Sequence, residues 1–397
     1  MIITGNNSFA AFSVIKNQSG AGIYIHIPFC KQACHYCDFH FSTSLKKKEE
    51  MIAAIIKEIG LRKNELGNTV IQTIYFGGGT PSVLSNEEIH GIIKAVYDNF
   101  TVVPEPEITL EANPDDLSPA RIADLSESPV NRLSIGIQSF FEEDLKLMNR
   151  AHNVKQAEEC IAEAVKYFDN ISIDLIYGIP DMSNKRWLTN IEKALSYGVP
   201  HISSYALTVE PKTALSTFIQ KGLVAPPSDE VAQEHFLLLA ECLASHGFIH
   251  YELSNFGKQG YFSQNNTAYW LGKKYLGIGP SAHSYNGSSR SWNIANNTLY
   301  LKSMQNNELP SETEILTMTD RYNEYVMTGL RTIWGVSAAR VKNEFGTLYY
   351  DYLHKQSKHF ITNGLLYFDD GVLKTTPKGK FLADGIASDL FFINLEK

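Results

Sequence analysis

The chain has 397 residues, of which 44% are hydrophobic and 20% charged, with a formal net charge of −8 at pH 7. This composition is typical of an ordinary globular protein, and the acidic balance excludes a basic nucleic-acid footprint. Apolar runs such as Ile52–Ile56 are too short for a transmembrane helix. Residues 1–21 are interpreted as a leader that lacks the basic start and apolar stretch of a signal peptide, which favours a cytoplasmic protein.

Strand-like and helix-like segments alternate from residue 22 onward. Apolar, β-branched runs typical of buried strands occupy residues 22–27, 70–76, 107–111, 132–135, 171–176 and 202–206. Helical patterns lie between them at residues 46–62, 86–99, 119–127, 154–168 and 185–197. This alternation predicts an α/β fold with a parallel sheet covered by helices. We expect an incomplete (β/α)6 barrel over residues 22–250, with a doubly wound sheet as the alternative.

The second half of the chain has a different character. A helical stripe at residues 229–246 is followed by residues 251–311, which are rich in Asn, Gly, Ser and aromatics and predict a connecting region over the barrel mouth. Residues 312–397 predict a winged-helix-like domain from three helices, at 320–331, 337–345 and 349–363, a hairpin turning at Asp370-Gly371 and a last helix. This domain lacks a basic recognition helix, so we expect no nucleic-acid partner.

Three of the five cysteines are clustered, at Cys30, Cys34 and Cys37. The C-x3-C-x2-C spacing offers three thiolates, whereas a structural zinc site needs four ligands. In a four-iron cluster, three cysteines leave one iron open to an outside ligand. The alternative is a zinc site that borrows a nearby histidine, His26, His35 or His40. Clustered cysteines without a disulfide framework also indicate a reducing compartment.

Polar or glycine-rich motifs follow the predicted strands. The run Gly77-Gly78-Gly79-Thr80-Pro81 follows the second strand, Glu111 ends the third, Gln138 and Arg150 follow the fourth, and Asp174 lies in the fifth. In a parallel barrel, the chemistry gathers at the C-terminal ends of the strands, so these motifs are expected at one face. Each also has a structural interpretation, such as a tight turn for the glycines or a surface charge at a helix end for Arg150.

The cysteine spacing is that of the radical S-adenosylmethionine (SAM) enzymes. Together with the strand-end motifs it resembles the oxygen-independent coproporphyrinogen oxidase family and its shorter relatives, the HemW-type haem chaperones. The resemblance covers residues 22 to about 390. It implies a [4Fe-4S] cluster on Cys30, Cys34 and Cys37, with SAM at the open iron. The SAM contacts that it implies are Tyr24, Tyr36, Gly78, Gly79, Thr80, Glu111, Gln138, Arg150, Asp174 and Ala206.

Two departures from the oxidase favour the chaperone subgroup. The oxidase has a further cysteine where this chain has Phe39, and it carries a longer segment before its cysteines. The resemblance therefore implies a protein that binds haem and hands it to a respiratory protein. It also implies an electron donor that reduces the cluster. Peripheral association with a membrane is compatible with this function. The alternative is the oxidase itself, so whether the chain is an enzyme stays open.

One position departs from the chaperone pattern. HemW-like sequences carry a His-Asn-x-x-Tyr-Trp segment linked to haem handling, and Asn265 stands here in place of its histidine. Because Asn does not ligate haem iron as histidine does, haem would be held by another residue, such as His283 or His250, or bound more weakly.

Overall fold

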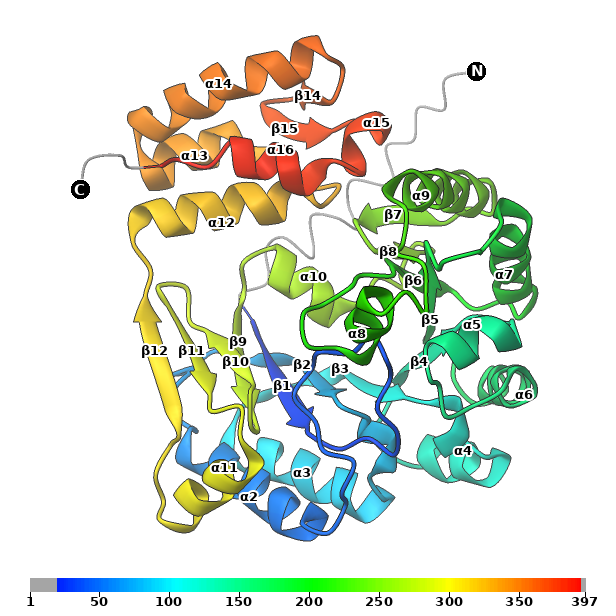
Figure 1. The fold of residues 1–397 in the computed structure, drawn as a ribbon. Coiled ribbons are helices and arrows are strands. Elements are labelled where there is room, and N and C mark those ends of the chain that lie inside the picture. Colours follow the sequence, from blue (N-terminus) through cyan, green and yellow to red (C-terminus); the bar gives the residue numbers. More distant parts are fainter. Residues whose placement is uncertain (1–19, 394–397) are drawn as a thin grey trace.

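The computed structural model describes residues 20–393, so the predicted leader lies almost entirely outside the described residues. Within that range a curved sheet of 12 strands is surrounded by helices, and a smaller C-terminal unit is seated at one end of it (Figure 1). None of the helices in the described range is both long enough and apolar enough to cross a bilayer.

Six parallel strands form the centre of the sheet and pair in chain order. They are β1 (Ala21–Ile27), β2 (Ile71–Gly78), β3 (Val102–Ala112), β4 (Arg132–Gln138), β5 (Ile171–Tyr177) and β6 (His201–Ala206). The outer layer comprises α2 (Lys48–Leu61), α3 (Asn86–Asn99), α4 (Pro119–Ser126), α5 (Glu142–Leu147), α6 (Val154–Ala164), α7 (Asn184–Ser196) and α9 (Asp229–Ser245). The predicted incomplete barrel is thus confirmed, and the doubly wound alternative is wrong because the strands pair in their sequence order.

The two faces of the sheet differ in polarity. Along β1, alternate residues Ile23, Ile25 and Ile27 are fully buried and belong to the core shared with the outer helices. The opposite face lines the barrel interior, because side chains alternate along a strand. That interior is polar: its buried side chains include Glu107, Thr109, Arg132, Ser172 and His201. Polar groups inside the barrel are therefore available to a ligand at the strand ends.

The connecting region extends the sheet at both edges. On one side β9 (Lys274–Ile278) pairs in parallel with β1 and continues into β10 (His283–Tyr285), β11 (Ser289–Asn293) and β12 (Ser311–Ile315). On the other side β6 pairs with β8 (Asn255–Gly257), which pairs with β7 (Ile249–Glu252). The prediction puts loops and short strands over the barrel mouth; the strands also satisfy the backbone groups that open barrel edges would expose. Three short helices were not predicted: α8 (Ala214–Gln220), α10 (Gln264–Trp270) and α11 (Asn297–Gln305).

The C-terminal unit has a hydrophobic core of its own, built around Tyr322, Val326 and Leu353. Its helices and three-stranded sheet follow the predicted winged-helix-like order. They are α12 (Met318–Leu330), β13 (Val336–Ser337), α13 (Ala338–Phe345), α14 (Thr347–Thr362), β14 (Leu366–Asp369), β15 (Val372–Thr375), α15 (Pro377–Lys380) and α16 (Ala383–Asp389). The unit touches the barrel where Lys380 Nζ donates to the carbonyl of His250 at 2.7 Å.

Candidate functional site

The three clustered cysteines lie in the loop after β1 and line one hollow. The loop is held at both ends, since the Cys30 amide donates to the Ser42 carbonyl at 3.0 Å and the Ser42 amide to the Pro28 carbonyl at 2.9 Å. We call this the cysteine hollow, with a volume of about 150 Å³. Its walls contain eleven of the thirteen predicted site residues: Cys30, Cys34, Cys37, Tyr36, Gly78, Gly79, Thr80, Glu111, Gln138, Arg150 and Asp174.

A chain of hydrogen bonds joins two of the cysteine sulfurs through three side chains from different strand ends. Thr80 Oγ1 donates to Cys30 Sγ at 3.3 Å, and Asn113 Nδ2 donates to Thr80 Oγ1 at 3.3 Å. Arg150 Nη2 donates to Asn113 Oδ1 at 2.6 Å, while its Nη1 donates to Cys34 Sγ at 3.2 Å. Hydrogen bonds to the sulfurs are one of the means by which a protein tunes a metal–thiolate site. Asn113 directly follows the third strand, and this position is the sequence signal that relates it to the other strand-end residues.

Arg150 is buried beside the cysteines and is not a surface charge. Helix α5 ends at Leu147, three residues earlier, so the expectation that Arg150 ends the helix is wrong. The Asn149 backbone, with φ of 56°, turns the chain inward before it. Arg150 Nε is buried and has no hydrogen-bond partner in the described part of the chain. An unused donor on a buried guanidinium is well suited to an anionic ligand, because arginine binds carboxylates with paired N–H groups.

The glycine run brings the end of β2 against the cysteine loop. A Cβ on Gly79 would lie 2.6 Å from the Phe29 carbonyl oxygen and 2.8 Å from that of Ile27, so only glycine fits here. The Thr80 amide then donates to the Phe29 carbonyl at 2.7 Å. Gly78 has a φ of 105°, which other residues rarely adopt. The run therefore places Thr80 beside Cys30 and leaves backbone exposed in the hollow.

The end of β4 is strained. Gln138 has a φ of 66° although it is not glycine, and the pairing with β5 shifts register between Gly136 and Gln138. A Cβ on Gly136 would lie 2.9 Å from Gln138 Nε2 and 3.1 Å from Arg150 Nη2. Bulges and left-handed non-glycine residues concentrate at functional sites because they aim a side chain. Here the bulge turns the Gln138 amide into the cysteine hollow.

Two carboxylates form the floor of the hollow. Burial raises the pKa of Glu111 to about 7, even though Tyr75 donates to its Oε1 at 2.8 Å. Burial also raises the pKa of Asp174 to about 6, and Ser134 Oγ donates to Asp174 Oδ1 at 3.4 Å. The negative charge of Asp174 adds to the raised pKa of Glu111, because two like charges in one low-dielectric site oppose each other. Ligand hydroxyl or amino groups would relieve this unfavourable burial.

A second hollow adjoins the first. We call it the histidine hollow; it has a volume of about 510 Å³ and shares Phe39, Gly78 and Glu111 with the cysteine hollow. Its other lining residues are Tyr24, His26, Asp38, His40, Tyr269, Tyr275, Ser281 and His283. The predicted site residue Tyr24 thus lies here, stacked on Tyr75 with ring centroids 6.1 Å apart. Ala206, at the end of β6, lines neither of these two hollows.

The histidines considered as ligands differ in whether their ring nitrogens already form hydrogen bonds within the protein. His26 Nε2 bonds to the His40 carbonyl at 2.9 Å, and His40 Nε2 bonds to Asn297 Oδ1 at 2.7 Å. His250 is buried, and its Nε2 bonds to the Leu253 carbonyl at 3.0 Å. His283 is exposed, and among residues 20–393 no hydrogen bond to its ring is found. Of the two alternatives to Asn265, only His283 offers a free imidazole to a hollow.

Comparisons with known proteins agree with this geometry. The model of the "Radical SAM superfamily" matches residues 24–194, and that of the "HemN C-terminal domain" matches residues 316–382. The chain is 34% identical to the "Heme chaperone HemW" of Bacillus subtilis, over 91% of this chain and 97% of that protein. It is 32% identical to the protein of the same name from Mycobacterium tuberculosis, over 93% and 94% of the two chains.

A solved structure shows the same fold. The coproporphyrinogen III oxidase HemN of Escherichia coli superposes with a TM-score of 0.80 at 21% identity, over 96% of this chain and 93% of that one. The curved parallel sheet and the cysteine loop at its strand ends define a radical SAM protein. The chain belongs to the HemW family within that superfamily.

Membership of the superfamily implies a [4Fe-4S] cluster and SAM, and the residues present fit both. Three unpaired cysteines line one hollow, which is the donor set that leaves one iron open. The unpartnered Nε of Arg150 and the two buried carboxylates supply the charges that an amino acid with a ribose needs. Within residues 20–393, no three or more His, Cys, Asp or Glu side chains are arranged to hold a single metal ion.

Proposed function

We propose that this protein binds haem and acts as a haem chaperone that delivers it to a respiratory haemoprotein. The observation that carries the proposal is the 34% identity to "Heme chaperone HemW" across 97% of that protein. Phe39 supports it, since it occupies the place of the further cysteine that the oxidase resemblance would require. Phe39 is 67% exposed and lines both hollows, so an apolar ring stands where the two hollows join.

We further propose that the cysteine hollow holds the cluster and SAM. Cys30, Cys34 and Cys37 would ligate iron, and Arg150 Nε would meet the SAM carboxylate. Gly78, Gly79, Glu111 and Asp174 would bind its amino group and ribose. When bound, the cluster and SAM supply one-electron chemistry, and the protein contributes binding and orientation.

Haem would occupy the histidine hollow, with His283 as its iron ligand. The neutral imidazole is the form that binds iron. Although its side chain is exposed, partial desolvation against the wall of the hollow lowers the pKa of His283, and the nearby Arg290 charge lowers it further, which favours the neutral ring. The walls supply aromatic rings from Tyr24, Tyr269 and Tyr275, which suit a planar macrocycle.

The test is a haem titration of the anaerobically reconstituted protein, followed by its absorption spectrum. Wild type should bind one haem per chain, and His283→Ala should lose the spectrum of an imidazole-ligated iron. His90→Ala, at an exposed position on α3, is the matched control and should behave as wild type. Transfer of the bound haem to an apo-haemoprotein then tests delivery.

Two results would contradict the proposal. Wild-type protein with a complete cluster that retains no haem would exclude the chaperone function. Repeated conversion of coproporphyrinogen III under reducing, anaerobic conditions would instead establish the oxidase. If haem binds but His283→Ala keeps the wild-type spectrum, the ligand assignment is wrong while haem binding stands.

A further inference from the structure

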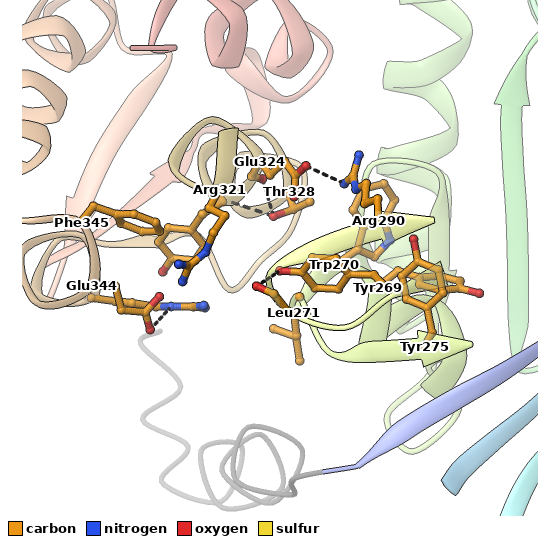
Figure 2. A pocket seen from close by; sticks show the side chains of 15 residues that line it. Tyr269, Trp270, Leu271, Tyr275, Arg290, Arg321, Glu324, Thr328, Glu344 and Phe345 are labelled. Carbon is orange, nitrogen blue, oxygen red and sulfur yellow. Dashed lines mark hydrogen bonds and ion pairs between the residues drawn. The ribbon is translucent and has the colours of Figure 1, made fainter. Parts of the chain in front are cut away.

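A third hollow lies between the barrel and the C-terminal unit. We call it the junction hollow; its volume is about 450 Å³. Figure 2 shows Tyr269, Trp270 and Tyr275 on the barrel side, and Arg321, Glu344 and Phe345 of the C-terminal unit facing them. The lining thus comes from α10, β9, β10 and β11 on one side and from α12 and α13 on the other. Neither the barrel nor the C-terminal unit forms this hollow alone.

The charges in the junction hollow leave one cation uncompensated. Arg290 Nη2 pairs with Glu324 at 3.0 Å, and Arg340 Nε pairs with Glu344 at 2.9 Å. Arg321 forms no ion pair or side-chain hydrogen bond with any residue that the structure describes. Its guanidinium lies 5.9 Å from the centroid of the Phe345 ring. Arg290 Nε is also buried without a hydrogen-bond partner in the described chain. An anionic ligand would satisfy these donors.

The walls of the junction hollow are aromatic as well as cationic. Trp270, Tyr325 and Phe345 line it, and the Arg340 guanidinium stacks over the Tyr325 ring at 4.3 Å from its centroid. Stacked arginines are held in a plane and keep their outer N–H groups free for a carboxylate. The hollow therefore suits a ligand with an apolar, planar body and carboxylate groups at its edge.

The junction hollow continues from the histidine hollow, because Tyr269 and Tyr275 line both. Their rings meet edge to face, with centroids 4.4 Å apart. On the neighbouring strands β10 and β11, His283 pairs with Trp292, and Tyr285 pairs with Arg290. His283 and Arg290 are thus diagonal neighbours on one face of the sheet, about 7–8 Å apart. One molecule of tetrapyrrole size can reach both.

We propose that the junction hollow binds the two propionate carboxylates of haem, with Arg321 as the principal partner and the free N–H groups of Arg290 and Arg340 beside it. This inference rests on the proposed function and deepens it, since it names a carboxylate subsite for the ligand whose iron faces His283. Because the subsite spans the barrel and the C-terminal unit, haem binding would also hold these two parts together.

The experiment compares haem with haem dimethyl ester, in which both carboxylates are esterified. Wild type should bind haem at least about tenfold more tightly than the ester, the size of one charge-assisted hydrogen bond. Arg321→Gln should weaken haem binding by about tenfold and leave the affinity for the ester unchanged. Glu324→Gln should strengthen haem binding, because it removes a competing carboxylate from Arg290. Protoporphyrin IX, which has no iron, should respond to Arg321→Gln but not to His283→Ala.

The controls separate this inference from the proposed function. Arg121→Gln removes the same charge from α4 and should bind haem as wild type does. Circular dichroism and iron content show whether each variant is folded and loaded. Equal affinities of wild type for haem and its ester, or an Arg321→Gln protein that keeps the preference for haem, would overturn the carboxylate subsite while haem binding itself stands. Absence of haem binding in wild type would contradict the proposed function instead.

Discussion

Glu58 of α2 anchors residues 274–305, the segment that carries His283 and Arg290 of the proposed haem site. Replacing Glu58 is the sharpest test of what holds this segment to the barrel. The side chain is fully buried. Its carboxylate accepts four hydrogen bonds: from Arg62 Nη1 at 3.0 Å, Asn293 Nδ2 at 2.7 Å, the Gly279 amide at 2.8 Å and the Tyr300 hydroxyl at 2.6 Å. Three of these donors belong to the segment, so one side chain fixes it to the barrel.

The expected loss of folding free energy depends on which buried groups each substitution leaves without a hydrogen-bond partner. In Glu58→Gln, the new amide nitrogen must face either Arg62 or the Gly279 N–H, and neither group can accept a hydrogen bond. An unsatisfied buried polar group costs about 1–3 kcal/mol, and breaking a buried ion pair costs about 3–5 kcal/mol. Arg62 keeps its pair with Glu65 at 2.7 Å, which favours the lower end. We expect a loss of about 3 kcal/mol for Glu58→Gln and about 4 kcal/mol for Glu58→Ala, which also leaves a cavity.

The assay is urea unfolding at neutral pH, followed by far-UV circular dichroism, with Glu65→Gln as the control. Glu65 is 39% exposed in its side chain, so its loss should cost less than about 1 kcal/mol. The slope of the transition should not change, since the same surface is exposed on unfolding. If the free energy of unfolding of Glu58→Gln lies within about 0.5 kcal/mol of that of wild type, the buried carboxylate does not anchor the segment and the reasoning from its hydrogen bonds fails.

Three further predictions concern the site and the contact between barrel and C-terminal unit. Arg150→Lys should keep the iron content but weaken SAM binding about tenfold, measured by the SAM-induced change of the cluster EPR signal, because lysine cannot donate from paired N–H groups. Thr80→Val should lower the reduction potential of the cluster in an EPR redox titration, because it removes the hydrogen bond to Cys30 Sγ. An unchanged SAM affinity in Arg150→Lys would contradict the first prediction, and an unchanged reduction potential in Thr80→Val would contradict the second. Burial lowers the pKa of Lys380 to about 8, so between pH 8 and pH 10 the unfolded chain binds more protons than the folded one, and stability rises with pH. Lys380→Met should abolish that rise, which amounts to about 2 kcal/mol between pH 8 and pH 10, and an identical pH dependence in both proteins would refute it.

The existence of the central strands was predictable, because a buried strand has a local signature, whereas their order in the sheet stayed open between a barrel and a doubly wound sheet. Short runs such as Ile171–Tyr177 carry β-branched residues between turn signals, and alternating helices force a parallel sheet. The same logic placed the strand-end motifs at one face, and eleven of the predicted residues do line one hollow. Their individual roles toward SAM stay predictions.

The parts that sequence reasoning missed depend on contacts between distant residues. The hydrogen-bonded link from Thr80 through Asn113 to Arg150 joins three strand ends, and no sequence pattern around Asn113 predicts these two contacts. Arg150 was open to interpretation as a surface charge because its burial comes from the cysteine loop, more than a hundred residues earlier. Strands β7–β12 are three to five residues long, too short for a clear periodic pattern, and they are defined by pairing with the barrel edges and with one another.

Asn265, where the chain departs from the HemW-like segment, is held inside the barrel by hydrogen bonds and does not face any of the three hollows described. It lies in the first turn of α10 and is only 3% exposed. Its backbone N–H donates to Glu107 Oε1 at 3.1 Å, and Thr73 Oγ1 donates to its side-chain Oδ1 at 2.9 Å. These bonds fix α10, whose far end carries Tyr269 and Trp270 to the histidine and junction hollows.

Asn265→Ala should therefore act through the position of α10. We expect it to destabilise the protein by about 1–2 kcal/mol, because the Thr73 hydroxyl loses its acceptor inside the barrel. Haem affinity should fall, but the absorption spectrum of the haem that does bind should stay that of wild type, since the iron ligand is elsewhere. A changed absorption spectrum of the bound haem in Asn265→Ala, with the spectrum of His283→Ala unaltered, would place the iron at α10. Helix α10 would then be part of the ligand set, and the hydrogen bond from Thr73 Oγ1 to Asn265 Oδ1 would have to break when haem binds.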